Sequence, residues 1–156
     1  MSQYWTDIER TALEQARTLH DLIPVAMDIM GRMSPPICML SGPLSTGGKG
    51  SLEENMRVFA RAIHMLDEKG LAVFDQIPFQ EALVRLTDHH NRTDYCHEML
   101  DIFYWGVLES GRIRRIYFLP AWQTSIGASW EREMAIRLGI EVIDFPEEWA
   151  QELLTV

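Results

Sequence analysis

The sequence predicts an α/β fold built on a parallel sheet, and three observations indicate it. Short apolar runs alternate with helical patterns at the spacing of βαβ units. A loop rich in glycine and hydroxyl residues, 41–51, and a turn containing Pro120 and Gly127 each lead from an apolar run into a helical pattern. The 156 residues suit a core domain, 35–156, preceded by a helical arm, 1–34.

Composition and charge limit the possible partners. The formal net charge of −9, with no basic patch to offset it, argues against nucleic acid or an anionic membrane as a partner. Cys38 and Cys96 lie far apart in no metal-ligand spacing, which favours a reduced, cytoplasmic protein. The N-terminus lacks a signal-peptide pattern, and no apolar run approaches the roughly 20 residues of a membrane span. We therefore expect a cytoplasmic protein without a membrane or nucleic-acid partner.

The N-terminal arm is predicted to be helical. Apolar residues recur at roughly helical spacing through Asp7–Met33, and Pro24 is expected to kink or split this helix. Met27, Met30 and Met33 make its second part apolar and adaptable. We expect a helical extension that docks on the domain or on a second subunit.

Strands and helices alternate through the rest of the chain. Ser34-Pro35-Pro36 ends the arm, and Ile37–Leu40 is the first predicted strand. Leu52–Lys69 has one apolar face and is followed by Gly70, which predicts a helix and its stop. The later predicted strands are 71–74, 113–119 and 141–145, and the later predicted helices are 79–86, 94–108, one that ends at 138 before Gly139, and 146–154.

The corner Tyr117–Ala135 carries the first candidate catalytic residue. Pro120 cannot continue a strand, and Ser125 with Gly127 allows a helix to begin in a tight space. Glu131 is then expected in or near the first turn, where the helix dipole would lower the pKa of its carboxyl and keep it ionised as a nucleophile. The alternative is an ordinary first-turn acid that only stabilises the helix.

The glycine-rich loop 41–51 is a near miss for the phosphate loop of ATPases. Its spacing is one residue too long, and Gly50 occupies the place of the hydroxyl residue. The glycines and the hydroxyls of Ser41 and Thr46 still suit a bound phosphate or sugar. Because the loop follows the first strand of a parallel sheet, we expect it at the same sheet edge as Glu131. The alternative is a flexible turn without a ligand.

The segment 89–101 offers two further candidates. Asp101 lies in an apolar helical pattern, either on its solvent face or directed into a cleft, where burial would raise its pKa and suit it to proton transfer. A group of potential metal ligands precedes it, but the spacing of recurring zinc sites is missing, so no metal is predicted. The residues of that group are His89, His90, Asp94, Cys96 and His97.

Several motifs together resemble the nucleoside 2-deoxyribosyltransferase-like superfamily, in particular its small branch of uncharacterised bacterial and phage domains. They are Ser41-Gly42-Pro43, Asn55 and Phe59 on the next helix, Gly70, and LPAWxxSxGAxxExxxA from Leu119 to Ala135. The resemblance implies a flavodoxin-like or Rossmann-like three-layer sandwich with a parallel sheet of four or five strands. It also implies cleavage or exchange of the N-glycosidic bond of a (deoxy)nucleoside or its 5′-monophosphate, with no cofactor.

The resemblance further implies roles by position. Glu131 would be the nucleophile that attacks C1′, and Asp101 would assist departure of the base by proton transfer. Ser125 would bind a phosphate. Independently of the resemblance, the position of Trp122 in the loop before Glu131 suits it to cover a ring, and the alternative is an ordinary core or rim tryptophan. Further sugar- or phosphate-binding positions are Ser41, Gly42, Pro43, Thr46, Gly47, Gly48, Lys49, Asn55 and Gly127.

The leading prediction is a hydrolase, an N-glycosidase acting on a (deoxy)nucleoside 5′-monophosphate. The alternatives are a deoxyribosyltransferase that exchanges bases and a non-catalytic nucleotide-sensing module. The longer first loop with Lys49 and the N-terminal arm depart from the well-studied enzymes, which leaves the base and the sugar open. Family members commonly pair, and the methionine-rich arm offers an apolar surface, so a homodimer is predicted.

Overall fold

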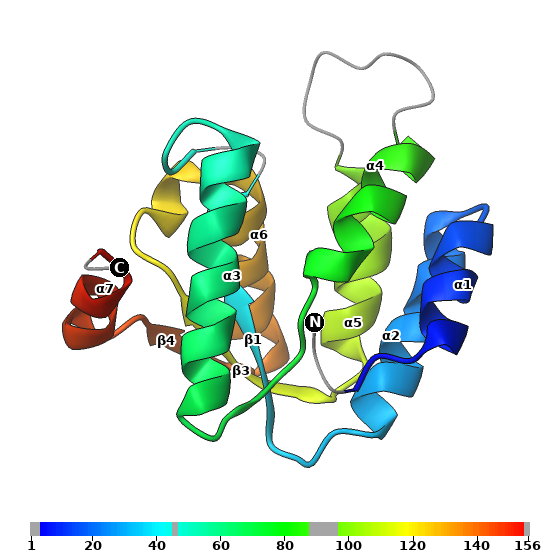
Figure 1. The fold of residues 1–156 in the computed structure, drawn as a ribbon, viewed down its shortest axis with the longest axis horizontal. Coiled ribbons are helices and arrows are strands. Elements are labelled where there is room, and N and C mark those ends of the chain that lie inside the picture. Colours follow the sequence, from blue (N-terminus) through cyan, green and yellow to red (C-terminus); the bar gives the residue numbers. More distant parts are fainter. Residues whose placement is uncertain (1–3, 45–46, 88–96, 155–156) are drawn as a thin grey trace.

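The computed structural model describes residues 4–44, 47–87 and 97–154 and has the predicted α/β architecture (Figure 1). Four parallel strands form one sheet in the order β2-β1-β3-β4. Their bounds are β1 (Ile37–Ser41), β2 (Ala72–Val73), β3 (Ile113–Phe118) and β4 (Glu141–Asp144). This order places the loops that follow β1 and β3 side by side at the carboxyl edge of the sheet, the usual ligand position in such folds.

Helices cover both faces of the sheet, so the fold has the three layers expected of a flavodoxin-like protein. One face is covered by α3 (Leu52–Glu68) and α7 (Glu147–Leu154). The other face is covered by α2 (Leu22–Gly31), α4 (Gln80–Thr87), α5 (Trp105–Glu109) and α6 (Ile126–Leu138). The remaining elements are α1 (Asp7–Gln15), the short turns η1 (Leu19–Asp21), η2 (Ile77–Phe79) and η4 (Trp122–Thr124), and the π-helix η3 (Met99–Tyr104).

Alternation along the central strands divides the core in two. Cys38 and Leu40 of β1 pack in the core beneath α3 and α7. Ile37 and Met39, which point the opposite way, belong to the larger core beneath α2, α4, α5 and α6. Every residue of β1 is buried, because a parallel sheet covered on both faces leaves no strand face for solvent.

The N-terminal arm breaks earlier than predicted. α1 ends at Gln15, and Thr18 then caps η1 by accepting a hydrogen bond from the backbone N–H of Asp21. Pro24 lies in the first turn of α2, where its missing N–H would have had no helical partner. The arm is therefore split into two helices, one of the two outcomes predicted, and the break lies before Pro24 rather than at it.

The arm docks on the domain of its own chain. α2 packs against α5, and α1 packs against α2 (Figure 1). Met30 and Met33 are buried in the core that they share with Ile37 and Met39. These two methionines therefore do not form the free apolar surface on which the dimer prediction relied.

Most predicted element boundaries hold to within one or two residues. Gly70 and Gly139 end α3 and α6 with φ of +84° and +73°, the left-handed conformation that glycine adopts without a steric penalty. In the predicted helix 94–108, residues 97 onward lead into η3 and then α5, and residues 94–96 lie outside the described ranges. Across the described residues, no helix combines the length and the apolar character needed to cross a membrane.

Candidate functional site

The strand-to-helix corner after β3 is held in place by its neighbours. The backbone N–H of Leu119 donates to the carbonyl of Ser41 at 2.9 Å, which ties the corner to the end of β1. Ser125 caps α6, because its Oγ accepts a hydrogen bond from the N–H of Ala128 at 3.1 Å. Glu131 is the sixth residue of α6, one turn further along than predicted.

The carboxyl of Glu131 is buried and has a raised pKa. Only 5% of the residue is exposed, and burial raises the pKa of its carboxyl to about 8. The neighbouring Ser41 side chain lowers this pKa, but by less than burial raises it. The prediction of a lowered pKa is wrong for two reasons. The carboxyl lies beyond the first turn, where the helix dipole acts, and the core surrounding it removes the water that stabilises the charge.

Glu131 lines a small cavity at the carboxyl edge of the sheet. The cavity has a volume of about 30 Å³. Its walls come from the loop after β1, the segment after β2, α4, η3 and the start of α6, which are far apart in the sequence. The lining residues are Gly42, Leu44, Gln76, Gln80, Met99, Leu100, Tyr104, Ser125, Gly127, Ala128 and Glu131.

Three buried polar atoms at or beside this cavity have no hydrogen-bond partner among the described residues. They are Oγ of Ser41, Oε1 of Gln76 and Oε2 of Glu131. Ser41 is 0% exposed and Gln76 is 2% exposed, so bulk water does not satisfy them. Each unsatisfied buried group costs about 1–3 kcal/mol. Their presence at one cavity is typical of a site whose hydrogen bonds are completed by a ligand or water.

Five of the predicted site residues meet at this cavity. Ser125, Gly127, Gly42 and Glu131 line it, and Ser41 lies beside Glu131. The strand order explains the meeting, because β1 and β3 are neighbours and the loops at their carboxyl ends share one edge.

Sequence reasoning missed three polar residues of this cavity, Gln76, Gln80 and Tyr104. Nε2 of Gln80 donates a hydrogen bond to the hydroxyl of Tyr104 at 3.2 Å, which links α4 to η3. Gln76 follows β2 and so lies at the same sheet edge as Glu131. Its position after a predicted strand was the available signal, whereas Gln80 and Tyr104 lie on helices without a motif.

The glycine-rich loop uses its backbone amides internally. The N–H of Gly48 donates to Oγ1 of Thr124 at 2.8 Å, and the N–H of Lys49 donates to Oδ1 of Asn55 at 2.9 Å. The N–H of Gly50 donates to the carbonyl of Gly47 at 3.2 Å. The amides of residues 48–50 are therefore not available to cradle a phosphate.

Packing explains the two glycines at the tip of this loop. Gly47 and Gly48 have φ of +71° and +61°, and a Cβ on Gly48 would lie only 2.5 Å from Cβ of Pro43. Nδ2 of Asn55 donates to the carbonyls of Leu44 and Gly47 at 2.8 and 3.1 Å. The Asn55 amide thus holds the loop, which gives this predicted binding residue a structural role.

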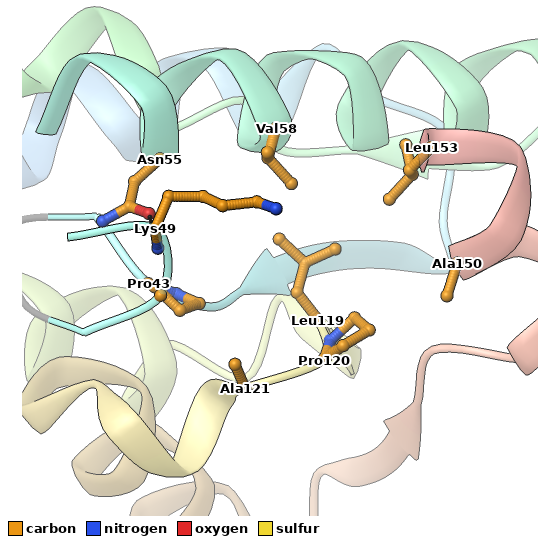
Figure 2. Close-up of a pocket in the computed structure, with 10 residues that line it drawn as sticks. Pro43, Lys49, Asn55, Val58, Leu119, Pro120, Ala121, Ala150 and Leu153 are labelled. Atoms are coloured by element: carbon orange, nitrogen blue, oxygen red, sulfur yellow. Dashed lines mark hydrogen bonds between the residues drawn. The ribbon is translucent and has the colours of Figure 1, made fainter. Parts of the chain in front are cut away.

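The loop separates two cavities. Gly42 and Leu44 line the cavity of Glu131, whereas Pro43, Gly48, Lys49 and Asn55 line a larger one of about 260 Å³ next to α3 and α7 (Figure 2). The predicted phosphate-binding residues are therefore divided between two sites.

Three other predicted residues lie away from the cavity of Glu131 or outside the described ranges. Asp101 is on η3, whose Met99, Leu100 and Tyr104 line the cavity, but its own side chain is exposed. The ring of Trp122 packs against Phe118, and the Arg132 guanidinium lies 4.3 Å from its centroid. Thr46 lies outside the described residues.

Metal-binding side chains do not gather in the described part of the chain. There, no group of three or more His, Cys, Asp or Glu side chains is placed to hold an ion. Of the five potential ligands in segment 89–97, His89, His90, Asp94 and Cys96 lie outside the described ranges.

Comparisons of the chain with protein-family models, curated proteins and solved structures find no match.

Proposed function

We propose that this protein is an N-glycosidase that releases the base from a (deoxy)nucleoside 5′-monophosphate, as a member of the nucleoside 2-deoxyribosyltransferase-like superfamily. One observation carries the proposal. The buried carboxyl of Glu131 lies on a polar cavity at the carboxyl edge of the sheet, beside the Ser41 hydroxyl, and the buried Oε1 of Gln76 on the same cavity has no partner among the described residues. Such a carboxyl, expensive to bury, is typical of catalytic positions.

In the proposed reaction the Glu131 carboxylate attacks C1′ of the sugar. The bonding electrons between C1′ and the base nitrogen leave with the base, which takes up a proton, and a glycosyl ester forms on Glu131. Water then attacks C1′, which releases the sugar 5-phosphate and restores the carboxylate. The amide of Gln76 offers both a donor and an acceptor, as the edge of a base or a sugar hydroxyl requires.

The start of α6 is the proposed position of the 5′-phosphate. Ser125 and Gly127 of the first turn line the same cavity as Glu131. The N-terminus of a helix favours a bound anion because its dipole is positive there; in α6 the N–H of Ala128 is already taken by Oγ of Ser125.

The cavity must widen to admit this substrate. Its volume of about 30 Å³ is far below that of common small-molecule sites, which span roughly 300–1,000 Å³. Leu44 and Met99 are only half-buried and line the cavity, so they are the side chains expected to move aside. The unbranched side chain of methionine adapts to such changes at little cost.

Incubation with each ribonucleoside and deoxyribonucleoside 5′-monophosphate, followed by chromatographic detection of free base, tests the proposal. We expect base release from at least one of them and a loss of about 10⁴-fold or more in kcat for Glu131→Ala, as found when nucleophiles are removed from other enzymes. The matched control is Glu133→Ala, because Glu133 is exposed on the same helix and pairs with Arg137.

Three outcomes would contradict the proposal. Undiminished release by Glu131→Ala would remove Glu131 from the mechanism. Transfer of the sugar to an added second base, faster than hydrolysis, would make the protein a deoxyribosyltransferase. Binding of a nucleotide without any release, unaffected by Glu131→Gln, would identify a non-catalytic nucleotide-sensing module.

Asp101 is proposed as the proton donor to the leaving base, and its role has a separate test. We expect Asp101→Asn to slow base release about 100-fold for an ordinary base, within the range of general acid catalysis. A substrate whose base leaves readily without protonation should recover most of this loss, whereas Glu131→Ala stays inactive on both substrates. Equal loss on both substrates would contradict a proton-donor role. The exposed position of Asp101 requires that substrate binding bring the base to η3.

The homodimer also stays a prediction, and light scattering in solution tests it. Its sequence basis is weakened, because Met30 and Met33 are buried within their own chain.

A further inference from the structure

The larger cavity beside the glycine-rich loop has the composition of a binding site, and it is separate from the cavity of Glu131. It lies between α3 and α7, above the carboxyl ends of β1 and β3, and has a volume of about 260 Å³ (Figure 2). That volume suits a small molecule better than a peptide or a helix. Binding of a ligand at this cavity does not require the proposed N-glycosidase activity.

The walls of this cavity are apolar. Val58 of α3, Leu119 and Pro120 after β3, and Ala150 and Leu153 of α7 line it. The side-chain amide of Asn55 also reaches it, but its Nδ2 and Oδ1 are engaged by the backbone of the glycine-rich loop. A sugar or a bare phosphate would therefore lose most of its hydrogen bonds to water without replacing them.

Lys49 supplies a positive charge at this apolar cavity. Figure 2 shows its side chain extending across the cavity, with the ammonium between Val58 and Leu119 in this view. Within the described ranges this ammonium has no ion pair or hydrogen bond. Lys49 is exposed, and its backbone N–H donates to Oδ1 of Asn55, which fixes the point from which the side chain reaches the cavity.

We propose that this cavity binds a small amphipathic anion, with an apolar body between α3 and α7 and a carboxylate paired with Lys49. The apolar body would displace water from Val58, Leu119 and Leu153, which the hydrophobic effect favours. The carboxylate would meet the free ammonium in a charge-assisted hydrogen bond. Inorganic phosphate lacks an apolar part and finds the amides of residues 48–50 engaged, so it is not a ligand of this site.

Titration of the full chain with octanoate, followed by calorimetry and by amide NMR shifts, tests the proposal. We expect saturable binding of one octanoate, with the largest shifts at Gly48, Ala121 and Ala150. Lys49→Gln should weaken binding roughly 10- to 100-fold, the expected loss of a hydrogen bond between charged groups. Ala150→Phe, which fills the cavity from α7, should abolish binding. The neutral 1-octanol should bind more weakly than octanoate and should not respond to Lys49→Gln.

The matched control is Lys69→Gln, because the Lys69 ammonium lies 4.7 Å from the centroid of the Trp149 ring and does not line the cavity. Octanoate affinity should not change in this variant. The proposal is overturned if octanoate shows no saturable binding, if Lys49→Gln and Ala150→Phe both bind it normally, or if inorganic phosphate binds as tightly. Amide NMR spectra of each variant confirm that the fold is retained, so a loss of binding can be assigned to the cavity.

Discussion

For a substrate whose base leaves readily without protonation, so that Asp101 is not needed, the rate constant kcat/KM for base release is expected to rise about tenfold for each pH unit below about pH 8 and to level off above it. Only the carboxylate of Glu131 can attack C1′, and burial raises the pKa of this group to about 8 in the free protein. Near neutral pH, most molecules then carry the unreactive protonated form. Initial rates at low substrate concentration measure this profile from about pH 7 to pH 9.5. The whole range lies above the second pKa of the substrate phosphate, about 6.

The direction of this profile distinguishes two roles for the same carboxyl. Activity that falls as the pH rises through about 8 would mean that the protonated carboxyl acts, as a general acid, and would contradict the nucleophile assignment. A pH-independent rate over this range would place the pKa of the carboxyl well below 8 and remove the basis of the prediction. Glu133→Gln, which changes an exposed carboxyl on the same helix, should leave the profile unchanged.

The fold was predictable because its strongest determinants are local. β1 and β3 are short apolar runs, and Gly70 and Gly139 stand where helices must end. Pro24 indicated a kink or a split, and the arm does split, but the break falls before the proline, which fits the first turn of α2.

Part of the candidate site followed from topology. Once β1 and β3 are neighbours, Ser41 and Gly42 must lie near the corner that leads to Glu131. The protonation state of Glu131 could not be predicted in this way, because a pKa depends on burial by residues from other elements. Gln80 is another such case, since only the packing of α4 against η3 brings it to the cavity.

The glycine-rich loop shows how one composition serves different purposes. Glycines that allow a phosphate to approach and glycines that allow a neighbouring chain to approach look alike in sequence. Here Gly48 packs against Pro43 and donates its N–H to Thr124. The partner Thr124 lies 76 positions further along the chain, so no local pattern could reveal that the Gly48 amide is occupied.

The substitution Glu131→Gln is expected to stabilise the fold, and the gain should grow with pH. The carboxyl of Glu131 has a pKa of about 8 in the folded protein and its ordinary value, 4.5, when unfolded. Between these values the unfolded chain has lost a proton that the folded protein keeps. The free energy of unfolding of the native protein therefore falls by about 1.4 kcal/mol for each pH unit from this group. Glutamine does not titrate, so the variant lacks this loss.

Denaturant unfolding of both proteins at several pH values between about 5 and 8 measures the difference between their free energies of unfolding. This difference should reach roughly 4 kcal/mol at the upper end of the range. Other titrating groups are common to both proteins and cancel in the comparison. Glu9, whose pKa is lowered to about 2 by hydrogen bonds from Thr6 and Arg32 that outweigh the effect of burial, titrates below this range in the folded state.

A difference in free energy of unfolding that does not change with pH would show that Glu131 is ionised in the folded protein. The profile of kcat/KM should then rise at a correspondingly lower pH. The two measurements thus report one pKa through independent properties, stability and rate. A variant that is more stable than the native protein and inactive would show that the buried acid lowers the stability of the fold. Its presence would then be explained by its role in the reaction, because a neutral glutamine at the same position folds better.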